Sequence, residues 1–99
     1  MNGKLLAFID IFAESQQMEK VVDSLSKLVS LEELYEVTGE FDLTIMVSAS
    51  DIEELRDIMK NKIMKVEGIK STVSSIVLKA YKGPKCPVNR PKPSVDASL

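Results

Sequence analysis

The stretch LEELYEVTGEFDLTIMVSA, residues 31–49, decides the fold because it predicts two antiparallel strands. From Phe41 to Ala49 apolar and polar residues alternate, which is the period of a strand with one buried face. Residues 31–38 form a second strand-like run. Gly39-Glu40 separates the two runs, and glycine at the first turn position suits a type II′ turn. We therefore expect a tight β-hairpin.

The segment before the hairpin predicts one further strand and one helix. Residues 4–13 (KLLAFIDIFA) are apolar at both alternating positions except for Asp10, as in a strand buried on both sides. Between Gln17 and Val29 apolar residues recur at helical spacing, and charged residues occupy the opposite face. This segment is an amphipathic helix, and Ser15 is its expected N-cap.

A second helix and a last strand follow the hairpin. Ser50-Asp51-Ile52-Glu53 fits a capping box, with Ser50 as N-cap and Glu53 at the third helical position. The predicted buried stripe comprises Ile52, Leu55, Met59 and Ile63, with Ile58 and Met64 at its margins. Beyond Gly68, residues 69–82 are rich in β-branched side chains and predict the final strand.

The predicted order β-α-β-β-α-β is the ferredoxin-like α+β arrangement, here over residues 1–82. Right-handed crossovers place both helices on one face of a four-stranded antiparallel sheet in the order 4-1-3-2. The other face is left bare, yet the first strand is apolar on both faces, with Leu6, Phe8 and Phe12 on one and Leu5, Ala7, Ile9 and Ile11 on the other. Because a monomer would expose these apolar groups, we expect a homodimer that packs sheet against sheet.

Composition excludes several classes of function. The chain has no His and one Cys, Cys86, so His-dependent nucleophiles and Cys/His zinc sites cannot be built. We expect no catalytic residue, no metal site and no cofactor. A net charge of −2 argues against direct nucleic-acid binding. The apolar runs are too short to span a membrane, and we expect a cytoplasmic protein.

The C-terminal segment differs in composition from the rest of the chain. Residues 83–99 contain all four prolines, several basic residues and few large apolar groups. Such a segment predicts a flexible, Pro-rich basic tail. Cys86 lies within this segment, where we expect an ordinary exposed thiol.

Two motifs resemble the C-terminal regulatory (RAM) domain of the Lrp/AsnC transcription regulators. Residues 36–42 (EVTGEFD) are similar to that family's VTG-acid-aromatic-Asp hairpin. Residues 68–74 (GIKSTVS) resemble its Gly-Val-x-x-Thr-x-Thr entry into the last strand. The resemblance implies a ferredoxin-like domain that dimerises through its sheet and commonly assembles dimers into larger rings. It also implies a stand-alone form, because the predicted first strand leaves no room for a helix-turn-helix before it.

In that family free amino acids bind at the contact between neighbouring dimers. The resemblance therefore implies a ligand site made of two segments, with Gly39, Glu40, Phe41 and Asp42 in the hairpin and Thr72 and Ser74 in the last strand. It further implies a domain that catalyses nothing and modulates transcription regulators, full-length Lrp/AsnC proteins included, by oligomerisation or co-assembly.

The chemistry of these residue types agrees with an amino-acid ligand. Asp42 can pair with an ammonium group, and the backbone N–H groups of Gly39 and Glu40 can donate to a carboxylate. The plainer interpretation is that Gly39 is a turn residue and Asp42 caps the hairpin. Asp10 is expected to be a satisfied interface group, with a Lys as a candidate partner.

Two other classes of protein share the predicted fold. One is an ACT-like ligand-binding module, which normally serves a neighbouring enzyme. The other is a small dimeric α+β-barrel enzyme, which usually places a His or a polar cluster in a central cavity. Binding of an amino acid would favour the RAM domain or the ACT-like module over the enzyme, and association with an Lrp-type regulator would favour the RAM domain alone.

Overall fold

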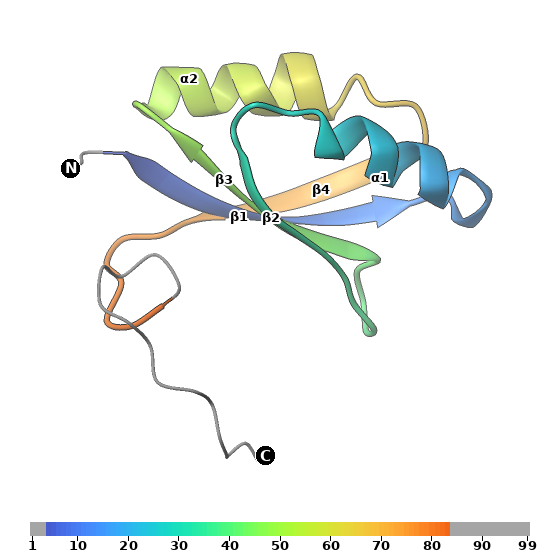
Figure 1. Ribbon diagram of the computed structural model, residues 1–99, viewed down its shortest axis with the longest axis horizontal. Helices are drawn as coiled ribbons and strands as arrows, with labels where there is room; N and C mark the ends of the chain where they lie inside the picture. The colour runs from blue at the N-terminus through green and yellow to red at the C-terminus, as the bar shows by residue number, and fades with distance from the viewer. Residues whose placement is uncertain (1–3, 84–99) are drawn as a thin grey trace.

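A computed structural model describes residues 4–83 of the chain, and Figure 1 shows the arrangement. The strands are β1 (Leu5–Ala13), β2 (Leu31–Glu36), β3 (Leu43–Ala49) and β4 (Ile69–Ile76). The helices are η1 (Ser15–Gln17), α1 (Met18–Ser26), α2 (Ile52–Asp57) and η2 (Ile58–Ile63). The predicted tail from residue 84 onward, with Cys86, lies outside the described residues.

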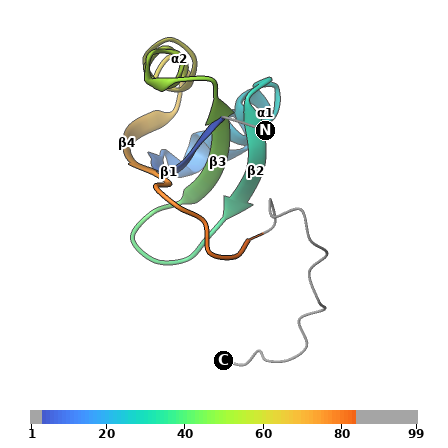
Figure 2. The same ribbon diagram turned by 90° about the vertical axis from the view of Figure 1, so that its left-hand side faces the viewer.

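The predicted ferredoxin-like topology is confirmed. The strands form one antiparallel sheet in the order β2-β3-β1-β4, which is the expected order read from the other edge. Both α1 and α2 lie on the same side of this sheet, as the two perpendicular views show (Figures 1 and 2). The chain after β4 turns away on the opposite side. No helix among the described residues is long and apolar enough to cross a membrane.

The hydrophobic core lies between the helices and one face of the sheet. Strand β1 contributes alternate side chains to it, Ala7, Ile9, Ile11 and Ala13, all buried. Residues directly opposite each other on neighbouring strands share a face, so Leu43, Ile45 and Val47 of β3 join this set. The side chains of β1 that face the helices are therefore those at odd positions.

The other face of the sheet mixes apolar and polar side chains. Phe8 is 40% exposed there and Val73 is 51% exposed. Between them on this face, the Asp10 carboxylate accepts a hydrogen bond of 2.8 Å from the Thr44 hydroxyl. Within the described residues Asp10 is thus satisfied by a cross-strand hydroxyl and forms no ion pair with a Lys. In the part of the chain that the structure describes, no helix covers this bare face (Figure 2).

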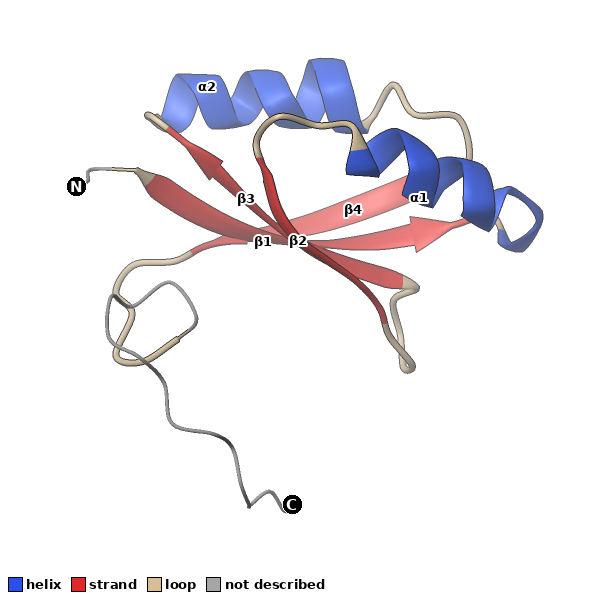
Figure 3. Cartoon of the chain, viewed as in Figure 1, coloured by secondary structure: helices blue, strands red, loops and turns tan. Residues whose placement is uncertain are grey.

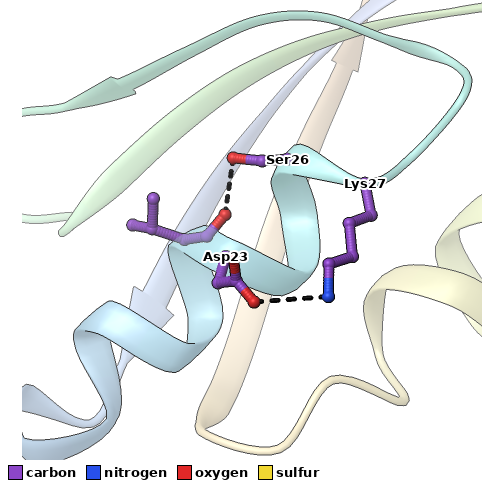
Figure 4. A network of polar contacts seen from close by, with 4 residues as sticks. Asp23, Ser26 and Lys27 are labelled. Atoms are coloured by element: carbon purple, nitrogen blue, oxygen red, sulfur yellow. Dashed lines mark hydrogen bonds and ion pairs between the residues drawn. The ribbon is translucent and has the colours of Figure 1, made fainter.

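Helix α1 is shorter than the periodic pattern predicted. Ser15 belongs to the short 3-10 turn η1 rather than capping α1, whose N-cap position is Gln17. The last turn is held by polar contacts, with the Ser26 hydroxyl donating to the Val22 carbonyl at 2.7 Å (Figure 4). Lys27 and Asp23 form an ion pair at 3.4 Å in the same turn. Val29, predicted on the apolar stripe, lies beyond the helix and is fully exposed.

Helix α2 begins one residue later than predicted. The N-cap is Asp51, whose carboxylate accepts the Glu54 N–H at 2.8 Å. Glu54 in turn accepts hydrogen bonds from the Ser50 N–H and hydroxyl. These two bonds lower the pKa of the Glu54 carboxyl. The helix is therefore capped by Asp51, and Glu54 at the third helical position reaches back to Ser50 instead of to the N–H of the N-cap, so the predicted capping box is replaced by this shifted pair of contacts.

The buried stripe of the second helix also differs from the prediction. Ile52 is 46% exposed, whereas Ile58 is buried along with Leu55 and Ile63. Residues 58–63 form the π-helical continuation η2, visible as one unbroken helix with α2 (Figure 3). A π-turn brings residues five apart onto one face, so Ile58 and Ile63 both reach the core.

The predicted end of the last strand and the predicted hairpin turn both differ from the structure. Strand β4 ends at Ile76 instead of residue 82, and the chain then turns, with the Lys79 ammonium 5.3 Å from the centre of the Tyr81 ring. The predicted two-residue turn at Gly39-Glu40 is a longer loop over residues 37–42. One backbone bond, from Val37 N–H to the Asp42 carbonyl at 3.1 Å, closes that loop.

Candidate functional site

The hairpin loop is fastened to the end of β1 by three contacts. Asp42 donates its N–H to the Ile11 carbonyl at 3.0 Å. Its carboxylate oxygen Oδ2 accepts the Ala13 N–H at 2.9 Å. Beside them the Phe41 ring packs on Phe12, with ring centroids 4.7 Å apart and a tilt of 47°. The loop is therefore positioned by β1, 29 residues earlier in the chain, rather than by its own turn.

The two carboxylate oxygens of Asp42 differ in their hydrogen bonding. Oδ2 satisfies the Ala13 N–H, which agrees with the plainer interpretation of Asp42 as a group that caps local backbone. Within the described part of the chain, Oδ1 receives no hydrogen bond. The half-buried carboxylate can therefore hold the loop and still accept a second donor, such as an ammonium group.

Gly39 and Glu40 form the exposed tip of the loop. Gly39 has a positive φ of 120°, a backbone conformation that residues with a side chain rarely adopt. A Cβ added at Gly39 would meet no atom within 4 Å. Because the tip is exposed, its backbone N–H groups are accessible to an anionic group from outside the subunit.

Thr72 and Ser74 lie on the helix-covered face of β4. Thr72 is opposite Ile11 and Ser74 is opposite Ile9, both core residues of β1. Thr72 is half-buried, and its hydroxyl lies 3.8 Å from the Met64 sulfur at the end of η2. Ser74 is exposed. Met64 was predicted only as a margin of the helix stripe, and nothing in the local sequence indicated this contact.

One subunit does not bring the two predicted segments together. Asp42 lies in the hairpin loop directly before Leu43 of β3, whereas Thr72 lies within β4. Strand β1 also runs between them, because Ile11 pairs with Leu43 on one side and with Thr72 on the other. The carboxylate and the hydroxyls therefore do not converge within a single chain.

The start of β4 is fixed by a close approach to the first helix. Gly68 accepts the Glu14 N–H at 2.8 Å and has a φ of 103°. A Cβ at this position would lie 2.6 Å from the Gln17 Cβ and 2.8 Å from the Val21 Cγ2. Glycine is therefore required where the chain enters the strand that carries Thr72 and Ser74.

Residues 6–85 match the model of the protein family described as the Lrp/AsnC ligand binding domain. The chain belongs to the Lrp/AsnC family of ligand-binding domains. An HTH-type transcriptional regulator of Pyrococcus abyssi is 37% identical over 79 residues, which cover 80% of this chain and 50% of that protein. The chain thus spans about half the length of the curated relatives it matches.

Solved structures place this Lrp/AsnC domain in the same fold. E. coli AsnC is 27% identical with a TM-score of 0.77, covering 89% of this chain and 56% of AsnC. A transcriptional regulator from Neisseria meningitidis in complex with L-Met has a TM-score of 0.76 at 23% identity, covering 80% of this chain and 53% of that one. The predicted family and fold are confirmed, while the predicted ligand residues remain a prediction.

Proposed function

We propose that this Lrp/AsnC domain binds a free amino acid at a contact between subunits. The observation that carries the proposal is the separation of Asp42 from Thr72 and Ser74 by β1, which runs between β3 and β4. Groups that do not converge within one chain cannot together hold one small molecule, whereas groups from two subunits can. A ligand held by two subunits also biases their association by its differential affinity, which makes the domain a sensor.

In the proposed site each polar group of the ligand has a partner of suitable chemistry. Asp42 Oδ1 accepts from the ammonium, and the backbone N–H groups of Gly39 and Glu40 donate to the carboxylate. Thr72 and Ser74 of the neighbouring subunit add hydroxyl hydrogen bonds. Phe41 acts by holding the loop against Phe12 and so fixes the position of Asp42.

L-methionine is the first ligand to test. The regulator from Neisseria meningitidis was crystallised with L-Met, and it shares the fold of this domain. In this chain Met64 is 43% exposed beside Thr72, so an apolar side chain would meet an apolar group there. A thermal-shift panel of the other amino acids tests whether the preference is wider.

The proposed biological role is the modulation of transcription regulators in the cytoplasm, without catalysis and without direct binding to DNA by residues 1–82. The curated relatives are named as transcriptional regulators, and this domain has a net acidic balance. Ligand occupancy would be transmitted to these regulators through changes in assembly. The assemblies proposed are homodimers formed through the bare sheet face, larger rings, and complexes with full-length Lrp/AsnC regulators.

The decisive variant is Asp42→Asn. An amide oxygen still accepts the Ala13 N–H, so the loop is retained, but the charge that pairs with an ammonium is lost. Losing a charge-assisted hydrogen bond costs about 1.5–3 kcal/mol, which is about one to two orders of magnitude in affinity. Titration calorimetry with L-methionine on wild type and Asp42→Asn measures this change. Asp23→Asn, on the exposed face of α1, is the matched control and should bind as the wild type does.

Two results separate this site from a merely structural role for Asp42. Thr72→Val should weaken binding by a smaller factor, about 2- to 10-fold, because it removes a neutral hydrogen bond. Equal affinity of Asp42→Asn and wild type, at an unchanged melting temperature, would show that the ligand does not use this carboxylate. Binding without any change in the mass of the assembly would contradict a site between subunits.

A further inference from the structure

The two edges of the sheet are built differently. The β2 edge has an irregular register between Leu31 and Glu33 and carries several acidic side chains, Glu33 and Glu36 among them. Charges and bulges of this kind discourage edge-to-edge pairing. The β4 edge runs from Ser71 to Ile76 without a charged residue, proline or glycine, and with regular pairing to β1. Among the described strands, β4 is therefore the edge better suited to the addition of another strand.

The backbone groups on the open side of β4 can be assigned from one hydrogen bond. The Val77 N–H donates to the Leu6 carbonyl at 2.8 Å, so residue 77 points its backbone groups toward β1. Since successive residues of a strand point to alternate sides, Thr72, Ser74 and Ile76 point theirs outward. Among the described strands β4 pairs with β1 alone, and these groups have no strand partner.

We propose that a second copy of this domain pairs with β4 along this edge, antiparallel and centred on Val73. In this register Thr72 of one copy lies opposite Ser74 of the other and exchanges backbone hydrogen bonds with it. Ser71 lies opposite Ser75, and the two copies of Val73 face each other across the two-fold axis. Lys70, the residue at the bulge, lies opposite Ile76, so no like charges meet.

This register also follows from burial. Val73 is 51% exposed in the single domain, although it sits in the middle of a strand. Pairing two copies about Val73 places these side chains against each other at a close, non-hydrogen-bonded position, with Cα atoms about 4.5 Å apart. The two-fold axis is perpendicular to the sheet, so the four strands of each copy join one continuous sheet with all helices on one side.

The edge contact is distinct from packing through the bare face. Sheets stacked face to face lie about 10 Å apart, and cysteines whose Cα atoms are more than about 7 Å apart cannot form a disulfide without backbone movement. A disulfide at the two-fold axis therefore reports edge pairing and not face packing. The proposal does not depend on any ligand.

The test uses single cysteines in full-length Cys86→Ser protein, oxidised mildly at a concentration where the protein is an oligomer by mass. Val73→Cys should yield covalent dimers as its main product. Ser71→Cys and Ser75→Cys should each stay largely uncrosslinked alone and should crosslink to each other when the two proteins are mixed, because only the mixed pair is opposed. Phe8→Cys, on β1 of the bare face, is the control and should stay uncrosslinked, because neither edge pairing nor packing of facing sheets brings its Cα atoms close enough for a disulfide.

Each outcome decides the proposal. Efficient Val73 dimers, together with crosslinking of the mixed Ser71 and Ser75 variants, support the edge contact in the stated register. Absence of Val73 dimers in a protein that is oligomeric by mass would overturn it. So would Ser71 variants that crosslink with themselves as readily as with the Ser75 variant, since that result requires another register or another surface.

Discussion

Gly68 lies so close to Gln17 that a Cβ on the glycine would stand 2.6 Å from the Cβ of the glutamine. This contact couples the entry of β4 to the first turn of the α1 region. The Glu14 N–H, which donates to the Gly68 carbonyl at 2.8 Å, holds the same junction from the backbone. Gly68, which directly precedes the last strand, is therefore a packing requirement.

Gly68→Ala should destabilise the domain strongly. The substitution adds a side chain at a φ of 103° and forces Gln17 or Val21 to move. Overpacking costs about 1–3 kcal/mol, and the left-handed backbone adds about 1–2 kcal/mol. Gly39→Ala is the matched control, because its φ is 120° but no atom lies within 4 Å. Urea unfolding of both variants should give a clearly larger loss for Gly68→Ala, and equal losses would refute the packing argument.

The Phe12–Phe41 pair should contribute measurably to holding the hairpin loop. A ring pair of this geometry stabilises by about 0.5–1.5 kcal/mol beyond burial of area. A double-mutant cycle with Phe12→Leu, Phe41→Leu and the double variant isolates this coupling in chemical unfolding. Coupling indistinguishable from zero would mean that the loop is held by the Asp42 bonds alone. Ligand affinity should fall with Phe41→Leu if the loop must be fixed to bind.

How far the sequence predicts this domain depends on the range of the interactions involved. The elements and their order were predicted correctly, because alternation and helical spacing are local patterns. The start of α2 was misplaced because Ser50 and Asp51 are both good N-caps, and the burial of Ile58 was missed because a π-turn breaks the regular period. The loop geometry could not be predicted, since Asp42 and Ala13 are 29 residues apart. For the same reason the separation of Asp42 from Thr72 by β1 emerged only from the register of the strands.

The N-cap of α2 should stabilise the domain measurably, and part of this stabilisation should depend on pH. Asp51→Ala removes the acceptor of the Glu54 N–H and should cost about 1 kcal/mol, or about 4–8 °C in melting temperature. The hydrogen bonds from Ser50 lower the pKa of Glu54, so their stabilisation is complete above the ordinary glutamate value of about 4.3. It is lost as the pH falls through the lower value in the folded state.

Glu54→Gln separates this effect from the titration of other carboxylates. The difference in melting temperature between wild type and Glu54→Gln should be present at neutral pH and shrink at acidic pH, where Glu54 becomes protonated. Thermal unfolding followed from neutral to acidic pH measures it. A difference that stays constant over the whole range would show that the Glu54 carboxylate makes no charge-dependent contribution to the cap.

Phe8→Lys should weaken the proposed dimer that packs through the bare sheet face. Phe8 lies on β1 opposite Met46 and is 40% exposed, whereas Met46 is nearly buried beside it. Burying a phenylalanine side chain is worth about 1.5–3 kcal/mol, and a two-fold interface buries two copies. Loss of both corresponds to about 3–6 kcal/mol, or about two to four orders of magnitude in the dimer dissociation constant.

Val29→Lys is the matched control for Phe8→Lys, since Val29 is fully exposed and lies off this face. Sedimentation equilibrium should show Phe8→Lys as a monomer, or as poorly folded protein, at concentrations where wild type and Val29→Lys are dimers or larger. A stable Phe8→Lys protein with wild-type mass would remove the bare face from the assembly and leave the β4 edge as the remaining candidate surface.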